Sequence, residues 1–459
     1  MSRSRTPEKA AGSFLSRITW RSPFWLPVLA IVMVLLALIP GESTPDETVG
    51  KPRDVATNLA TLACPVHDEL SLMVGQIEAG SAAEARSIPA GTLDSAWSNP
   101  KIWRTGKVSG DALVVSQTGE GAGPVGYVAG TARKSIGSGL IVSRCPELLD
   151  EGWIVGMADQ GKSNITLANL GTAQAVVDVY WYSQIGPVED TESIGVVIEP
   201  GATKTLRIGS SVPTEHVVGA QIVRRRQQVS AIGISADKAG QGTELVLPQI
   251  ELGRSLVFAG LPDKGTMSVS ILNPHEETVR VKLRGIRSGG AFDIEGLTDV
   301  AIKPQSTLKI DVPSKAKLNG QAIQAVADQR VAATVTVSTA KDIALLSPAV
   351  ELKRPSAVPV SLAGKNFTLT VVAPQDGGSV ALEGVDANMK VVARKNISVP
   401  AGSAMQVDLK KELKGAVAVV LKADGSIFAG AWSRSGDLIG GTPLAPAPVF
   451  IQVPAVAVR

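Results

Sequence analysis

The feature that most constrains this chain is an internal repeat with a spacing of 104 residues. A shift of 104 lays "GMADQGKSNITLANL" at 156–170 over "GLPDKGTMSVSILNP" at 260–274 without a gap. The same shift lays "PGATKTLRI" from Pro200 over "PQSTLKIDV" from Pro304, and a further copy begins near "NFTLTVVAP" at 366–374. Because a repeat is one structural unit copied along the chain, this spacing predicts tandem domains that share a fold.

The pattern inside each copy is that of β-strands. In "VRVKLR", Val279, Val281 and Leu283 fall on one face of an extended chain, and three basic residues fall on the other. This period of two is typical of strands with one face in a core, and turn sequences such as "NPHEE" and "PQDGG" separate them. About seven strands per copy predict an all-β chain of tandem antiparallel β-sandwiches, immunoglobulin-like in type. A β-propeller with shorter blades is the alternative.

The N-terminus has the pattern of a membrane anchor. The apolar run "PFWLPVLAIVMVLLALIP" at 23–40 follows five basic residues, which are Arg3, Arg5, Lys9, Arg17 and Arg21. A helix over 24–39 would span about 24 Å at roughly 1.5 Å per residue, with Trp20 and Trp25 placed for the membrane interface. We expect a single-pass cell-membrane protein with a cytoplasmic N-terminus and an extracytoplasmic bulk. Secretion after cleavage of a signal peptide is the alternative.

The anchor and the repeat together divide the chain into predicted segments. The region before residue 150 is included because 111–146 follows the same order of strand, turn and strand as 220–249. The predicted segments are a cytoplasmic basic segment at 1–22, a transmembrane helix at 23–40, a linker at 41–57, an irregular first β domain at 58–150, and β-sandwich repeats at 151–253, 254–355 and 356–459, the last with a Pro-rich tail.

The stretch "GMADQGKS" at 156–163 matches the G-x-x-x-x-G-K-[ST] pattern of a phosphate-binding loop. Such a loop works where it leads from a strand into a helix, whose N-terminal N–H groups hold the phosphates. Here "NITLANLG" continues as strand and turn, and the repeated copy has Thr266 and Met267 in place of Lys162 and Ser163. The glycines are therefore interpreted as turn residues, and no nucleotide is expected as a partner.

Other residue combinations that carry catalysis are missing from the sequence. The three histidines, His67, His216 and His275, lie in separate repeats without metal-ligand spacing. No G-x-S-x-G motif is present, and "GAGPVG" at 121–126 leads into a strand rather than a dinucleotide-binding helix. With 45 basic and 42 acidic residues, the chain has no general attraction to nucleic acid. We therefore expect no enzyme activity, no cofactor, no metal site and no nucleic-acid partner.

The best candidate for a binding patch is one aromatic strand with a nearby arginine cluster. The strand "VYWYS" at 179–183 carries rings on both faces, so one face is expected to lie outward unless another domain covers it. The turn "RRRQQ" at 224–228 would hold an anionic envelope polymer or a lipid surface. The alternative for this turn is a charged tip that prevents sheet edges from associating. The candidate patch comprises Tyr180, Trp181, Tyr182, Arg224, Arg225 and Arg226.

The two cysteines, Cys64 and Cys145, are expected to form one disulfide. An exported chain with an even cysteine count is a candidate for pairing, since its compartment is oxidising. The bond would close a loop of about 80 residues and stabilise the first domain by roughly 4–5 kcal/mol in the chain-entropy model. Two buried free thiols are the alternative.

Three segments carry a resemblance to a known family: "LACP" at 62–65, "SRCPELLDEGW" at 143–153 and "IEPGATKTLRI" at 198–208. Together with the anchor, they resemble actinobacterial envelope proteins of unknown function, which have one N-terminal membrane segment and an exported all-β region. The resemblance implies that location and fold, and it brings no catalytic residues.

The function expected from these observations is that of a non-enzymatic, membrane-anchored structural or interaction protein of the cell envelope. Its partner would be an envelope protein or a cell-wall polysaccharide. A polysaccharide-binding accessory protein in cell-wall or glycan assembly is the alternative.

Overall fold

The computed structural model describes most of the chain after residue 52. The described residues are 53–56, 59–77, 82–89, 97, 103–118, 123–133, 137–157, 163–211, 218–236, 242–448 and 450–453. The predicted basic segment at 1–22 and the predicted transmembrane helix at 23–40 lie outside them. None of the helices in the described residues has the length and hydropathy that a membrane span requires.

The chain separates into two compact units. One comprises Met1–Val55 with Gln452–Arg459, and the other comprises Ala56–Ile451. The strands β1 (Arg53–Ala56) and β36 (Phe450–Val453) pair with each other. The strands β2 to β35 belong to the larger unit, which is all-β as predicted.

In the described part of the larger unit, the strands form four consecutive groups, each built on two main sheets. One long strand joins the two main sheets of the third group, and the fourth group also contains a two-stranded sheet. The first group is β2 (Leu59–Pro65), β3 (Ser71–Gln76), β4 (Ala82–Ile88), β5 (Arg104–Gly106), β6 (Ala112–Thr118), β7 (Pro124–Ala132) and β8 (Gly139–Arg144). The second group is β9 (Glu151–Met157), β10 (Asn164–Asn169), β11 (Ala175–Tyr182), β12 (Pro187–Val188), η1 (Thr191–Ser193), β13 (Val196–Ile198), β14 (Thr203–Arg207), α2 (Ile208–Ser211), β15 (Val218–Arg226), β16 (Val229–Ala236) and β17 (Thr243–Val246).

The third and fourth groups follow without a long linker. The third is β18 (Gly253–Phe258), β19 (Thr266–Asn273), β20 (Val279–Arg287), β21 (Gly290–Asp293), β22 (Val300–Ile302), β23 (Ser306–Val312), η2 (Ser314–Ala316), β24 (Ala322–Ser338) and β25 (Ile343–Leu346). The fourth is β26 (Ser356–Pro359), β27 (Ser361–Leu362), β28 (Lys365–Asn366), β29 (Thr368–Ala373), β30 (Gly378–Val385), β31 (Val391–Val399), β32 (Ser403–Asp408), α3 (Leu409–Glu412), β33 (Ala418–Asp424), β34 (Phe428–Ser435) and β35 (Leu438–Pro443).

The four groups share one strand order. We call the sheet that ends in the last strand of each group its axial sheet, and these sheets have the orders β5-β3-β7-β8, β14-β10-β16-β17, β23-β19-β24-β25 and β32-β29-β34-β35. We call the other sheet of each group its side sheet, built on β2-β6-β4, β9-β15-β11, β18-β24-β20 and β26-β33-β30-β31. In the third group the long strand β24 contributes to both sheets.

This order does not confirm the immunoglobulin-like type. In an immunoglobulin domain the first strand shares a sheet with the second, and the seventh lies beside the sixth. In the second group the first strand, β9, pairs with β15, and the second strand, β10, pairs with β16. The first and second strands of this sandwich therefore lie in different sheets, unlike those of an immunoglobulin domain.

Each group has a core between its two sheets, so each is a sandwich. In the second sandwich, Ile165 and Leu167 from the axial sheet pack in one cluster with Val177, Val179 and Trp181 from the side sheet. The alternation predicted for the third sandwich is confirmed, because Val279, Val281 and Leu283 are all buried while Arg280 is exposed. Burial of these apolar faces is the main force that holds each sandwich together.

A buried asparagine explains part of the 104-residue repeat. The side-chain Nδ2 of Asn169 donates to the carbonyls of Ala173 and Ile198, and its Oδ1 accepts from Gly171 N. Asn273 makes the corresponding bonds to Glu277 O, Ile302 O and His275 N. One side chain thus satisfies backbone groups in a tight turn and ties that turn to a neighbouring strand. The residue recurs because the turn depends on it.

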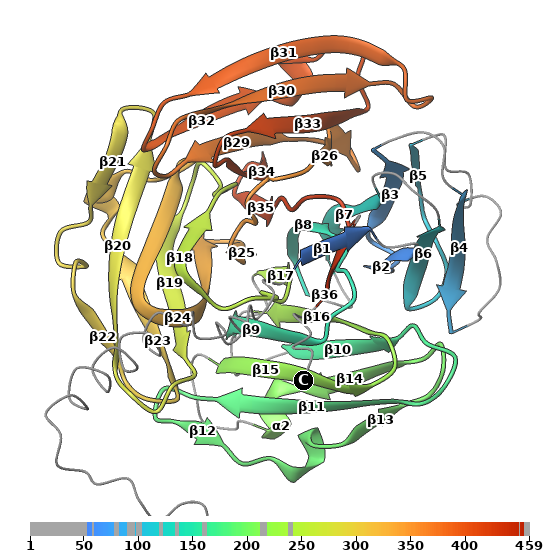
Figure 1. Ribbon diagram of the computed structural model, residues 1–459, viewed down its shortest axis with the longest axis vertical. Helices are drawn as coiled ribbons and strands as arrows, with labels where there is room; N and C mark the ends of the chain where they lie inside the picture. The colour runs from blue at the N-terminus through green and yellow to red at the C-terminus, as the bar shows by residue number, and fades with distance from the viewer. Residues whose placement is uncertain are drawn as a thin grey trace, which may run out of the picture. The chain divides into compact units, whose positions relative to one another are not determined.

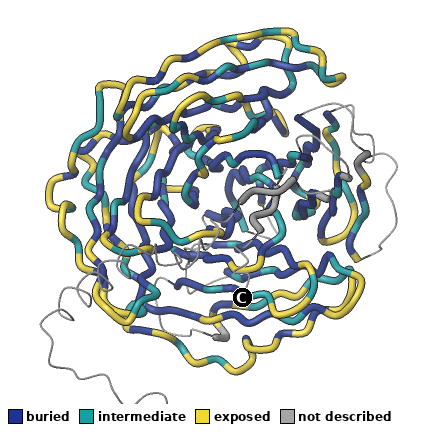
Figure 2. The backbone as a smooth tube through the Cα atoms, in the orientation of Figure 1, coloured by how far each residue is buried: buried dark blue, intermediate teal, exposed yellow. Residues whose placement is uncertain are grey.

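The four sandwiches follow one another around a common centre within the larger unit (Figure 1). The last strands β8, β17, β25 and β35 contact one another in turn at this centre, which we call the axis. Figure 2 shows that buried backbone dominates the centre while exposed backbone lies along the periphery. An arrangement of repeated units around a central axis is typical of β-propellers, whose blades are single four-stranded sheets. Here each repeated unit is instead a two-sheet sandwich.

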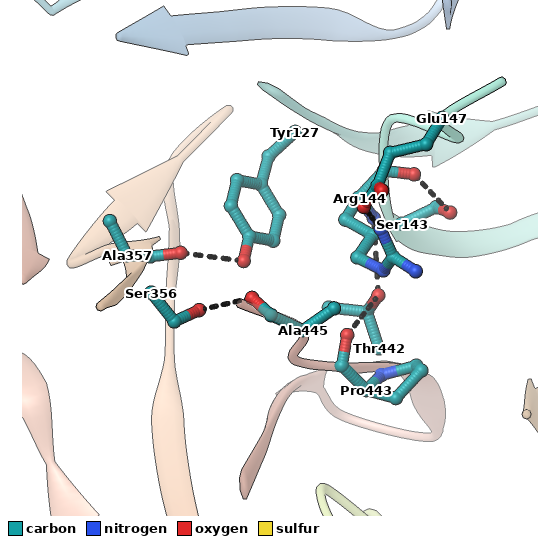
Figure 3. Close-up of polar contacts among 9 residues, drawn as sticks. All are labelled: Tyr127, Ser143, Arg144, Glu147, Ser356, Ala357, Thr442, Pro443 and Ala445. Atoms are coloured by element: carbon teal, nitrogen blue, oxygen red, sulfur yellow. Dashed lines mark hydrogen bonds and ion pairs between the residues drawn. The ribbon is translucent and has the colours of Figure 1, made fainter. Parts of the chain in front are cut away.

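The ring closes between the first and fourth sandwiches (Figure 3). The buried hydroxyl of Tyr127 on β7 donates to the carbonyl of Ala357 on β26 at 2.7 Å. Arg144 N at the end of β8 donates to Thr442 Oγ1 on β35 at 3.1 Å. These contacts join residues more than 200 positions apart, so closure requires the whole unit.

Candidate functional site

The axis is lined by the free edges of four strands. An edge strand presents backbone N–H groups that have no partner in its own sheet. Buried N–H groups without a partner are costly, so something must accept their hydrogen bonds. Two carboxylates, those of Asp342 and Glu244, take this role for the described axial strands.

The carboxylate of Asp342 accepts one backbone amide from the last strand of each sandwich, that is, from β8, β17, β25 and β35. Its Oδ2 accepts Leu140 N of β8 at 2.8 Å and Ile439 N of β35 at 2.9 Å. Its Oδ1 accepts Ile343 N of β25 at 2.9 Å, and the Thr243 N–H of β17 also donates to this carboxylate. Asp342 is only 1% exposed, so it joins four sandwiches through one buried side chain.

Glu244 lies one step further along the same strands. Its Oε1 accepts Leu245 N at 3.0 Å and Val142 N at 3.3 Å, and Gly441 N also donates to the carboxylate. Its Oε2 is buried without a hydrogen-bond partner. Glu244 therefore connects β17 to β8 and β35.

Both carboxyl groups titrate abnormally. Burial raises the pKa of Asp342 to about 7, although its four amide donors oppose the rise. Burial also raises the pKa of Glu244 well above its ordinary value, and the nearby Asp342 carboxylate adds to the increase. Groups with such pKa values occur at catalytic sites as well as in structural networks. Here backbone amides donate to three of the four oxygens of the two carboxyl groups, so the arrangement joins strands structurally. We call Asp342 and Glu244, together with the amides that donate to them, the clasp.

Neither carboxylate belonged to the predicted site. Each leaves one signal in the sequence, an acidic residue that interrupts an apolar stretch, in "TELVLP" and in "KDIALL". Within the described residues, no group of three or more His, Cys, Asp or Glu side chains could hold a metal ion.

The predicted aromatic patch is not a surface patch. Trp181 is 1% exposed and lies in the core of its own sandwich, where its Nε1 donates to Ser193 Oγ at 2.9 Å. Tyr182 is 9% exposed and packs with Trp153 against Leu272 of the third sandwich. Only Tyr180 is exposed, at 37%. The strand carries aromatics on both faces because one face fills a core and a neighbouring sandwich covers part of the other.

The predicted arginines are separated into different surroundings. Arg225 donates to Asp178 at 2.7 Å and to the Tyr180 hydroxyl at 3.1 Å. Although burial acts to raise it, the Gly195 N–H and the Arg225 guanidinium hold the pKa of Asp178 below its ordinary value. Arg224 turns away to Asp150, and Arg226 is exposed at the end of β15. The structure therefore does not bring the six predicted patch residues together.

Arg224 instead lines a polar groove of about 770 Å³ between the first and second sandwiches. One wall is the outward face of the first side sheet, and the other is formed by two turns of the second sandwich. The groove residues are Thr61, Glu84, Arg86, Ser116, Leu170, Gly171, Thr172, Arg224, Gln227 and Gln228.

Two other sequence predictions can be compared with the structure. The predicted disulfide between Cys64 and Cys145 is confirmed, with 4.5 Å between the two Cα atoms. The phosphate-loop pattern at 156–163 lies partly outside the described residues. The next element along the chain is strand β10, which begins at Asn164, and Ser163 Oγ donates to Ala236 O.

The chain belongs to a family of unknown function (DUF5719), whose model matches residues 104–410, well over half of the chain. The expectation of an uncharacterised family is thereby confirmed. No curated protein shows significant similarity to the sequence.

Two solved structures show low similarity to the chain. The entity "Biofilm associated protein - BSP domain" matches at 9% identity with a TM-score of 0.13, covering 87% of this chain and 96% of that one. A Bacteroides uniformis beta-glucuronidase matches at 8% identity with a TM-score of 0.12, covering 61% and 33%. Both TM-scores are too low to indicate a shared fold.

Proposed function

We propose that this protein is a non-enzymatic structural or interaction protein of the cell envelope, anchored in the membrane by residues 23–40 with its β-sandwiches outside. It has no cofactor, and its partner is an envelope protein or polysaccharide. Its role is to form a rigid ring of sandwiches whose loops and sheet edges are available to that partner.

The observation that carries this proposal is the clasp at the axis. The centre of a ring of sheets is a common place for a ligand or catalytic site. In this chain the two acidic residues there are used to satisfy the backbone of the axial strands. Because these buried carboxylates use their hydrogen bonds to join the sandwiches, the arrangement favours a rigid structural role over a catalytic one.

Two further observations support an extracytoplasmic location. The Cys64–Cys145 disulfide is of the kind that forms and persists in oxidising compartments. The basic residues before the apolar run at 23–40 orient the anchor with the N-terminus inside.

The location is tested by adding protease to spheroplasts that express the full chain. We expect digestion of everything after residue 40 and survival of a small N-terminal fragment. Full protection of the chain, or a mature form free in the medium, would contradict the anchored arrangement.

The interaction role is tested by crosslinking the full chain in intact envelopes and identifying the captured partner. Asp342→Asn serves as the comparison, because it weakens the ring without altering the surface. Loss of the crosslink in this variant is expected if a rigid ring is what the partner recognises. An enzymatic activity that survives purification and is lost in Asp342→Asn would contradict the non-enzymatic role.

A further inference from the structure

We propose that the groove between the first and second sandwiches binds a neutral, polyhydroxylated chain, that is, a segment of a glycan. The inference rests on the proposed envelope location and names the chemical class of one partner. It is carried by three properties of the groove: a row of polar side chains in register, walls that are fixed in place, and a balance of donors and acceptors.

The row lies across three paired strands of the first side sheet. Thr61 on β2 is directly opposite Ser116 on β6, and Ser116 is directly opposite Glu84 on β4. Thr61 Oγ1 and Ser116 Oγ are 3.1 Å apart. Because side chains directly opposite in a sheet share one face, two hydroxyls and one carboxylate line the same wall of the groove.

The facing wall is held in place by hydrogen bonds. The turn after β10 is fixed by Asn169, and Leu170 N donates to Gln228 O at 2.8 Å. Arg86 reaches across from the side sheet and donates to Leu170 O at 2.6 Å. Groups that are positioned before binding lose less conformational freedom when a ligand arrives, which favours recognition.

The chemistry of the lining matches hydroxyl groups better than a charged ligand. Arg86 and Arg224 already donate to protein acceptors, Leu170 O and Asp150, so neither is a free anion site. Glu84 places a carboxylate among them. Sugar hydroxyls both donate and accept hydrogen bonds, and they suit a surface that mixes hydroxyl, amide, guanidinium and carboxylate groups.

The same lining predicts weak binding. The groove has a volume within the usual range for ligand sites. No aromatic ring is among the lining residues that the structure describes, so stacking adds nothing. We expect a Kd on the order of 1 mM, or about −4 kcal/mol, for a short oligosaccharide.

The test is saturation-transfer NMR on the exported region with a panel of neutral oligosaccharides, comprising α-glucan, β-glucan, mannan, arabinan and chitin oligomers. We expect transfer to at least one of them. The double variant Glu84→Ala/Gln228→Ala removes two exposed groove side chains and should weaken that binding about tenfold. The matched control, Glu277→Ala/Gln329→Ala, removes a hydrogen-bonded pair from the third sandwich and should bind like the wild type.

A groove-filling variant gives a second measurement. Ser116→Tyr places a ring in the groove and should abolish transfer while the circular dichroism spectrum stays that of the wild type. The proposal is overturned if no panel member binds at millimolar concentration, if both double variants bind alike, or if a polyglutamate peptide binds in preference to every glycan. These results leave the protease test of location unaffected, so the two proposals can fail separately.

Discussion

The two junctions on either side of the second sandwich have the same backbone packing, but one is filled by side chains and the other leaves a groove. At each, a side sheet packs against the second strand of the next sandwich. Between the second and third sandwiches, Trp153 and Tyr182 cover Leu272, and the junction is sealed. Between the first and second, Ala168 stands at the position of Leu272 in the repeat, and a polar groove lies open beside it. The backbone repeat decides how the sandwiches meet, and side-chain volume decides whether a site is left between them.

Removing the aromatic seal should produce the largest effect. Trp153 is 4% exposed and lies 6.2 Å from Tyr182, centroid to centroid. Trp153→Ala should lower the free energy of unfolding by about 3–5 kcal/mol, because it leaves a cavity at a closed junction. Urea denaturation of the protein measures this. Ser116→Ala, at the open junction, should stay within about 0.5 kcal/mol of wild type. Similar losses in both variants would show that the junctions are not different.

Acidity should change the strength of the clasp that both junctions share. The folded pKa of Asp342, about 7, lies above an unfolded value of about 3.9. The folded state therefore binds more protons between these values, so the contribution of Asp342 to stability falls as pH rises from about 4 to about 7. The total change is about 4 kcal/mol at 1.36 kcal/mol per pKa unit. The raised pKa of Glu244 acts in the same direction.

The measurement is the urea midpoint at pH 5 and pH 8 for the wild type and Asp342→Asn. The variant should lose much of the decrease that the wild type shows between these two values. It should also be less stable than the wild type at pH 5, since the hydroxyl oxygen of a protonated carboxyl group can still accept a backbone N–H, whereas an amide NH₂ cannot. An identical pH response in the two proteins would rule out Asp342 as the titrating group.

A smaller loss of stability is expected when a methyl group is added at Gly219, where the junction between the second and third sandwiches is closely packed. A Cβ at Gly219 would lie 2.3 Å from Leu272 Cδ1 and 2.9 Å from Thr307 Cγ2. Gly219→Ala should therefore destabilise by about 1–3 kcal/mol through overpacking. Gly289→Ala is the matched control, because nothing lies within 4 Å of a Cβ there. A thermal melt that places both variants at the wild-type midpoint would mean that the junction yields to the added methyl group.

The smallest effect concerns the hydrogen bond that spans the open junction. Arg86→Met keeps the side-chain length and removes the bond to Leu170 O, so we expect a loss of about 1 kcal/mol. Arg280→Met, which breaks an exposed ion pair with Asp299, should cost less, at about 0–1 kcal/mol. Proteolysis of the native protein reports both. Greater sensitivity in Arg280→Met would indicate that Arg86 does not hold the first and second sandwiches together.

Local patterns in the sequence predicted strands well. The alternation at Val279, Val281 and Leu283 reports a burial pattern that is set by neighbouring strands in one sandwich. The pairing of Cys64 with Cys145 was also predictable, because the chain has only two cysteines and therefore only one possible pair. The candidate patch failed because Trp181 and Tyr182 were assigned by strand periodicity alone. Periodicity separates two faces of a strand, and it does not say that both faces are covered.

By itself, the sequence determined the elements, their repetition and the covalent link, because each of these depends on residues near one another or on simple counting. The tertiary structure alone decided the strand order, the closure of the ring and the role of Asp342. The amides that Asp342 accepts come from Leu140 and Ile439, 202 and 97 positions away. Such partners meet only after four sandwiches have folded and packed, since their approach depends on side-chain volumes at every junction between them. Because the packing depends on these side-chain volumes, a groove lies beside Ala168, whereas Trp153 and Tyr182 cover Leu272.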